Sequence, residues 1–147
     1  MGDEEAREGV GGALTARLVD VPGISEVLLE GLVTYSNAAK TARLGVPVEL
    51  LERHGAVSAE VAAAMALGAA RTSGARLAVS TTGVAGPGGG TPEKPVGLVH
   101  VGVALDGAVE THELRLPPHG RARIRDWTVT SACELARRAL LRALEPA

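Results

Sequence analysis

The chain has 147 residues and a formal charge of -2 at pH 7. This length predicts a single domain, and the near-neutral charge excludes a strongly basic surface as the basis of nucleic-acid binding. Only Tyr35 and Trp127 are aromatic, which also excludes a platform of aromatic side chains for stacking bases.

The sequence has one cysteine, Cys133, so an internal disulfide and a cysteine-based metal site are excluded. No apolar run reaches the roughly 20 residues that a membrane-spanning helix needs. Residues 1–8 are highly charged and do not resemble a signal peptide. We therefore expect a soluble, cytoplasmic protein that binds neither membranes nor nucleic acids.

Apolar periodicity predicts helices and strands in alternation along the chain. Residues 1–8 are expected to form a disordered or frayed N-terminus, followed by one domain over 9–147. The alternation, which ends in a hairpin and a long helix, predicts a three-layer α/β fold with a mixed sheet. The predicted helices cover 14–21, 38–44, 48–53, 59–72 and 121–144, and the predicted strands cover 27–35, 76–82, 97–105 and 108–116.

Local signals indicate where several of these elements begin and end. Ser58 is expected to cap the helix over 59–72, and Asn37 to cap the helix over 38–44, because such side chains accept hydrogen bonds from the first helical N–H groups. The pair Asp106-Gly107 separates two apolar runs and predicts a tight hairpin turn.

The most distinctive stretch, residues 82–97, is rich in glycine and proline and joins two predicted strands. It is not a P-loop, because Lys94 is flanked by Glu93 and Pro95. It is not a dinucleotide-binding turn either, because a strand and not a helix follows it. Two interpretations remain open, which are a concavity of backbone N–H groups that binds an anion and an ordered connection without a ligand.

A second informative stretch is residues 35–40, Tyr-Ser-Asn-Ala-Ala-Lys, where a predicted strand meets a predicted helix. The positive end of a helix dipole can lower the pKa of Lys40, so that this lysine would act as a general base beside Tyr35. The alternative is that Tyr35 packs, Asn37 caps the helix and Lys40 is solvated.

The four histidines do not have the spacing of metal ligands. His100 and His112 fall on the two strands of the predicted hairpin and could meet across it, but we expect no metal site. Cys133 falls inside the last predicted helix, where a small core residue is the expected role instead of a nucleophile.

Taken together, these stretches resemble the CinA C-terminal domain family, a bacterial family of competence/damage-inducible proteins whose enzymes are nicotinamide mononucleotide deamidases. The resemblance covers about 9–144. It rests on Gly-Leu-Val-Thr-Tyr-Ser-Asn-Ala-Ala-Lys at 31–40, Leu-Gly-Val at 44–46, His-Gly-Ala-Val-Ser at 54–58, the glycine-rich stretch at 82–97, and Gly120-Arg121 with Ile124-Arg125.

The resemblance implies a three-layer α/β/α fold and hydrolysis of the carboxamide of nicotinamide mononucleotide to nicotinate mononucleotide and ammonia, without metal or cofactor. In the family a serine nucleophile works with a lysine and a tyrosine, which match Lys40 and Tyr35. The resemblance further implies a substrate-binding pocket formed by Ser36, Asn37, Thr82, Gly83, Gly86 and Arg121.

The sequence departs from the family at the nucleophile. Family members read Glu-Ser-Cys-Thr-Gly-Gly where this chain has Arg-Glu-Gly-Val-Gly-Gly at 7–12, so Glu8 stands in place of the serine. A carboxylate has no proton for Lys40 to remove and attacks amides poorly. Activity would then need a replacement such as Ser36 or Thr82, or residues upstream of this sequence; otherwise the chain is an inactive nucleotide-binding or regulatory relative.

The family also has a helix and a first strand that have no counterpart in this sequence. We therefore expect a sheet that lacks one strand and exposes an unpaired edge. Such an edge favours self-association, so a homo-oligomer is expected.

Overall fold

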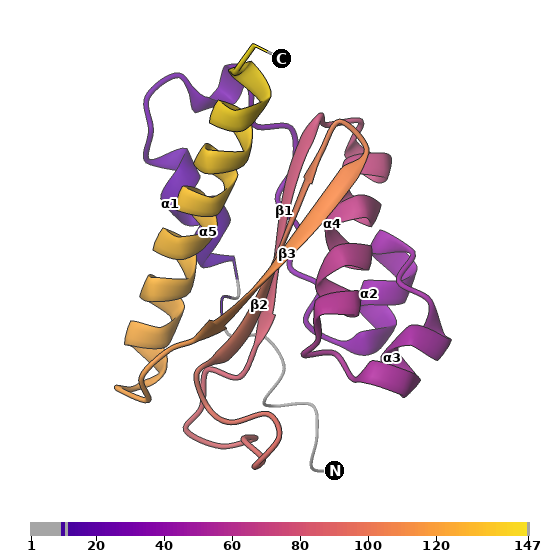
Figure 1. Ribbon diagram of the computed structural model, residues 1–147, viewed down its shortest axis with the longest axis vertical. Helices are drawn as coiled ribbons and strands as arrows, with labels where there is room; N and C mark the ends of the chain where they lie inside the picture. Colours follow the sequence, from indigo (N-terminus) through magenta and orange to yellow (C-terminus); the bar gives the residue numbers. More distant parts are fainter. Residues whose placement is uncertain (1–9, 11, 147) are drawn as a thin grey trace.

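The computed structural model describes residues 10 and 12–146, so the N-terminus expected to be frayed, 1–8, lies outside the described residues. A sheet lies between two layers of helices, which confirms the α/β/α arrangement (Figure 1). The helices are α1 (Ala13–Val19), the short 3-10 helix η1 (Ile24–Glu26), α2 (Asn37–Leu44), α3 (Val48–His54), α4 (Ala59–Ser73) and α5 (Arg121–Leu144). The strands are β1 (Leu77–Gly83), β2 (Leu98–Leu105) and β3 (Ala108–Arg115).

The described residues form one three-stranded sheet in the order β1-β2-β3, and both pairings are antiparallel. The predicted hairpin is confirmed, because Leu105 pairs with Ala108 across a turn made by Asp106 and Gly107. Their φ angles are 50° and 85°, as a turn with two left-handed residues requires.

The two faces of the sheet differ in the size of their side chains. Val99, Val101 and Val103 of β2 pack with Ile124 and other apolar residues of α5 on one face. On the other face α4 approaches closely, because a Cβ added to Gly102 would lie 2.4 Å from the carbonyl oxygen of Ala62. Residues of one strand point alternately to the two faces, so β2 supplies both packing surfaces.

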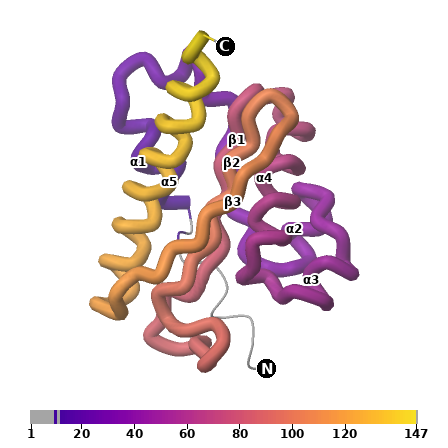
Figure 2. Tube along the Cα trace, viewed as in Figure 1, coloured from indigo at the N-terminus to yellow at the C-terminus, as the bar shows by residue number. Residues whose placement is uncertain are grey.

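The predicted strand over 27–35 is wrong, and so is the mixed sheet that it implied. This segment is assigned to no strand and links α1, which packs on α5, to α2, which packs on α4. It therefore has to cross from one helical layer to the other, and Figure 2 shows it passing β1 on the way. Short apolar runs rich in Val and Leu do not distinguish a paired strand from an extended crossing segment.

The helix caps confirm one prediction and correct another. The Ser58 hydroxyl accepts a hydrogen bond from the Val61 N–H at 3.3 Å, as expected for the cap of α4. In α2, however, Ser36 is the cap and its hydroxyl accepts from the Ala39 N–H at 3.0 Å, while Asn37 is the first helical residue. Serine and asparagine cap equally well, so adjacent candidates cannot be ranked from sequence.

A buried histidine lies on the α4 face of the sheet. His100 is 8% exposed, pairs with Thr82 of β1, and its Nδ1 has no hydrogen-bond partner in the part of the chain that the structure describes. Burial lowers the pKa of His100 below its ordinary value of 6.5, against the opposing effect of the Glu113 carboxylate. Neutral imidazole is therefore the form that this fold holds.

The packing of α2 on α4 depends on Gly68. A Cβ at this position would lie 2.0 Å from the carbonyl oxygen of Leu44. Gly68→Ala gains about 1 kcal/mol of helix propensity, but the overlap with main-chain atoms forces the helices apart. We expect a net loss of about 1–3 kcal/mol in the free energy of unfolding, measured by urea denaturation.

Gly88→Ala is the control, because no atom lies within 4 Å of a Cβ at Gly88. Equal stability of Gly68→Ala and the unmodified chain would contradict this account of the α2–α4 contact.

The buried His100 makes stability depend on pH. Below pH 6.5 the unfolded chain takes up a proton at this histidine while the folded chain resists it, so the unfolded state binds more protons and stability falls. Stability is complete above that value and is lost progressively as the pH decreases toward the lowered folded pKa. His100→Gln should flatten the dependence of the unfolding free energy on pH between pH 7 and pH 5, measured by urea denaturation at each pH. The same slope in this variant and in the unmodified chain would contradict the role given to His100.

Candidate functional site

Lys40 is the most buried charged side chain among the described residues, with 0% exposure, and it lies in the first turn of α2. Its Nζ donates hydrogen bonds to the carbonyl oxygens of Thr34, at 2.7 Å, and Tyr35, at 3.3 Å. Because the Ser36 cap starts α2 at this point, Lys40 lies one helical turn later and its side chain reaches back to the carbonyls that precede the helix. The solvated lysine considered as an alternative is therefore excluded.

The other predicted residues of this stretch have separate roles. Tyr35 meets Lys40 through its main-chain carbonyl, and the residue is 42% exposed. Ser36 uses its hydroxyl as the acceptor of the cap, and Asn37 lines a pocket between α2 and α3. The four candidate site residues of this stretch, Tyr35, Ser36, Asn37 and Lys40, therefore lie around the N-terminus of α2.

The end of β1 holds the second group of predicted residues. Thr82 is 1% exposed, and its hydroxyl donates to the Ala56 carbonyl oxygen at 2.7 Å, in the turn between α3 and α4. At Gly83 a Cβ would lie 2.9 Å from the Leu98 carbonyl oxygen, so only glycine fits against β2 here. Because its proton is engaged by a carbonyl, the Thr82 hydroxyl is poorly suited to replace a missing nucleophile.

The glycine-rich connection is attached to the helices on both sides of the sheet. Arg121, the first residue of α5, donates from Nη1 to the Gly86 carbonyl oxygen at 3.1 Å. On the other side Lys94 Nζ donates to the carbonyl oxygen of His54, the last residue of α3, at 2.5 Å. This role of Lys94 could not be predicted, because no local sequence pattern reveals a contact between residues that lie 40 positions apart.

The structure thus forms two groups of predicted residues. Tyr35, Ser36, Asn37 and Lys40 surround the start of α2. Thr82 and Gly83 end β1 and lead into the connection that contains Gly86, whose carbonyl oxygen accepts a hydrogen bond from Arg121. Elements near the C-terminal end of β1 connect the groups, since this strand contacts the α3–α4 turn and α3 contacts α2. Figure 1 shows α2, α3 and the glycine-rich connection in the same half of the molecule. Glu8, the residue in the place of the family serine, lies outside the described residues.

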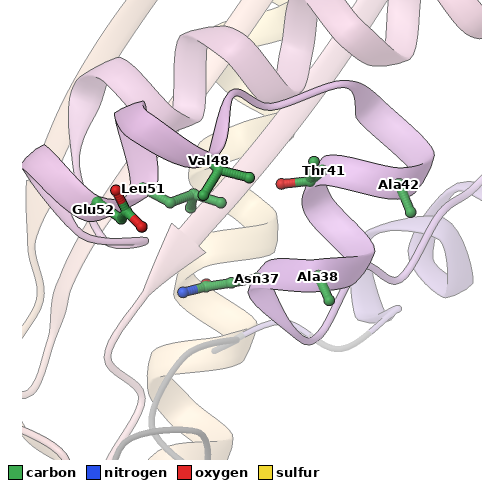
Figure 3. Close-up of a pocket in the computed structure, with 7 residues that line it drawn as sticks. All are labelled: Asn37, Ala38, Thr41, Ala42, Val48, Leu51 and Glu52. Carbon is green, nitrogen blue, oxygen red and sulfur yellow. The ribbon is translucent and has the colours of Figure 1, made fainter.

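A pocket of about 550 Å³ lies between α2 and α3 and was not anticipated (Figure 3). Of the predicted site residues only Asn37 lines it. The sequence signal that could have found it is the close succession of two short helices joined at Gly45-Val46-Pro47. The lining residues are Asn37, Ala38, Thr41, Ala42, Val48, Leu51 and Glu52.

Metal binding and thiol chemistry find no support in the described part of the chain. No group of three or more histidine, cysteine or acidic residues there could hold a metal ion. The suggestion that His100 and His112 meet across the hairpin is wrong, because His112 pairs with Val101 and so points to the opposite face. Burial raises the pKa of the Cys133 thiol, which disfavours the reactive thiolate.

The helices of residues 12–146 include none with the length and apolar character needed to cross a bilayer.

Comparison with known proteins identifies relatives of this fold and sequence. The model of the CinA C-terminal domain matches residues 7–140. A competence-damage inducible protein of Clostridium acetobutylicum is 55% identical over 131 residues, which cover 89% of this chain and 32% of that protein. A second relative, from Clostridium novyi, is 52% identical over 132 residues, 90% of this chain and 32% of its own length. The chain therefore spans about a third of these relatives.

Solved structures agree with the sequence comparison. The competence/damage inducible protein CihA from Agrobacterium tumefaciens matches with a TM-score of 0.82 and 48% identity, over 85% of this chain and 76% of that one. A CinA superfamily protein from Klebsiella pneumoniae matches with a TM-score of 0.87 and 30% identity, over 92% of this chain and 84% of that one. On the family match and these identities, the chain belongs to the CinA C-terminal domain family.

Proposed function

We propose that this chain binds nicotinamide mononucleotide between the start of α2 and the glycine-rich connection, and that it has lost most or all deamidase activity. The observation that carries the proposal is the burial of Lys40, whose Nζ donates hydrogen bonds to the carbonyl oxygens of Thr34 and Tyr35. Lysine side chains are almost never fully buried unless they are paired, so the complete burial of Lys40 supports a functional role.

The chemistry of amide hydrolysis explains why activity would be lost. A nucleophile must attack the carboxamide carbon, and a neighbouring base must accept its proton before ammonia can leave. Lys40 would be that base in an active relative, but Glu8 offers a carboxylate in place of a hydroxyl. The hydroxyls of Ser36 and Thr82 already cap a helix and bond to a main-chain carbonyl.

Binding of the nucleotide would need a partner for its phosphate. The guanidinium of Arg121 contacts the Gly86 carbonyl and so lies beside a connection rich in glycine. Arginine forms strong charge-assisted hydrogen bonds with phosphate, and glycine-rich backbone can present successive N–H groups to an anion. These groups support a phosphate subsite at the start of α5.

The nucleophile is tested by measuring ammonia release from nicotinamide mononucleotide. We expect little or no release by the unmodified chain and clear release by Glu8→Ser, because serine restores a hydroxyl that Lys40 can deprotonate. Glu8→Ala is the control, since it removes the carboxylate without adding a hydroxyl. Clear turnover by the unmodified chain would overturn the proposed loss of activity and direct attention to another nucleophile.

The phosphate subsite is tested by calorimetric titration with nicotinamide mononucleotide. Arg121→Ala should weaken binding by about 10- to 100-fold, the usual effect of losing a hydrogen bond to a charged group. Arg123→Ala removes the same charge from an exposed position two residues further along α5 and should change the affinity little. Absence of binding by the unmodified chain would refute the nucleotide pocket itself.

A further inference from the structure

The pocket between α2 and α3 is built differently from the proposed nucleotide site. Four of its lining residues come from α2 and three from α3, and neither Lys40 nor any residue of the glycine-rich connection is among them. Figure 3 shows the side chains of Thr41 and Asn37 directed toward the side of α2 on which Val48 and Leu51 lie. Its volume, about 550 Å³, lies within the range of sites for small organic ligands.

Two polar atoms of α2 are buried in this region without a hydrogen-bond partner in the described part of the chain. They are Oδ1 of Asn37 and Oγ1 of Thr41, and both residues line the pocket. Residues four apart lie on the same face of a helix, so the two oxygens belong to one surface. Buried polar atoms in proteins are nearly always hydrogen-bonded, which makes this pair unusual for a purely structural surface.

The chemistry of the lining restricts what can satisfy these atoms. An amide oxygen only accepts hydrogen bonds, and a hydroxyl accepts as well as donates. Glu52, which is exposed and lines the pocket from α3, adds a carboxylate that accepts only. A ligand that satisfies the two unpartnered oxygens must therefore supply hydrogen-bond donors, and a positive charge on it would be favoured by Glu52. Phosphates and carboxylates are disfavoured because the Glu52 carboxylate would repel them.

The remaining lining is apolar and fixes the rest of the ligand. Leu51 is 7% exposed, whereas Val48 is 49% exposed. Together with Ala38 and Ala42 these side chains provide a surface for a ring or a short aliphatic group. Such a surface gains from covering apolar area, and the acceptors fix the orientation of the ligand.

We propose that the α2–α3 pocket binds a small organic cation, with an apolar body against Val48 and Leu51 and a protonated amine directed at Asn37 Oδ1, Thr41 Oγ1 and the Glu52 carboxylate. The inference does not rest on the proposed nucleotide function. It assigns Asn37 to a different ligand from the one that the family resemblance implied.

The test uses benzylamine as the probe and benzyl alcohol as its neutral counterpart of similar shape. Titration of the full chain, followed by amide chemical shifts in two-dimensional NMR, should give saturable changes centred on α2 and α3 with benzylamine. Benzyl alcohol should bind at least several-fold more weakly. Added salt should weaken the binding of the amine more than that of the alcohol, because salt screens the interaction with Glu52.

Variants separate the charge from the hydroxyl. Glu52→Gln and Thr41→Val should each weaken benzylamine binding several-fold, and Thr41→Ser, which keeps a hydroxyl, should retain it. Glu49→Gln is the matched control, because Glu49 is an exposed acidic residue of α3 outside the pocket lining. Dispersed spectra of each variant establish that it is folded.

Three results would overturn the proposal. The first is that benzylamine causes no shift changes even at about 50-fold excess over roughly millimolar protein, a concentration at which weak, millimolar binding would be seen. The second is that benzyl alcohol binds as tightly as benzylamine. The third is that the shift changes map away from α2 and α3.

Discussion

The burial of β2 on both faces is the constraint on which the rest of this structure depends. Every residue of the strand except Leu105 is buried, so both faces must be covered by helices. Valines on one face suit the long helix α5, whereas Gly102 and Ala104 on the other allow α4 to approach the sheet. This difference in side-chain size decides which helix covers which face, and α1 and α2 then pack against α5 and α4.

The candidate site residues lie around the start of α2 and the end of β1. At the start of α2 the buried Lys40 side chain is held by main-chain oxygens, and at the end of β1 a threonine hydroxyl and two cationic side chains fix the turns around it. These contacts use main-chain carbonyls almost throughout. The positions of the groups therefore depend on the backbone of neighbouring elements and tolerate changes in most surrounding side chains.

Sequence reasoning located most elements because their ends carry local chemistry. Ser58 and the pair Asp106-Gly107 act on residues close to them, and the structure confirms both. The segment over 27–35 was assigned wrongly, since pairing depends on a neighbour that local sequence does not describe. For the candidate site, the resemblance selected residues such as Lys40 and Arg121. Their partners, and the α2–α3 pocket, arise from contacts between distant segments and could not be predicted.

The attachments of the glycine-rich connection have a mechanical consequence. One end is bonded through Arg121 to the layer that contains α5, and Lys94 bonds the other side to α3 in the opposite layer. The connection therefore links the two helical layers beside the C-terminal end of β1. The layers cannot separate there without breaking one of these two hydrogen bonds. Loss of either the Lys94 or the Arg121 side chain would therefore leave this connection attached by side-chain hydrogen bonding to only one of the two helical layers.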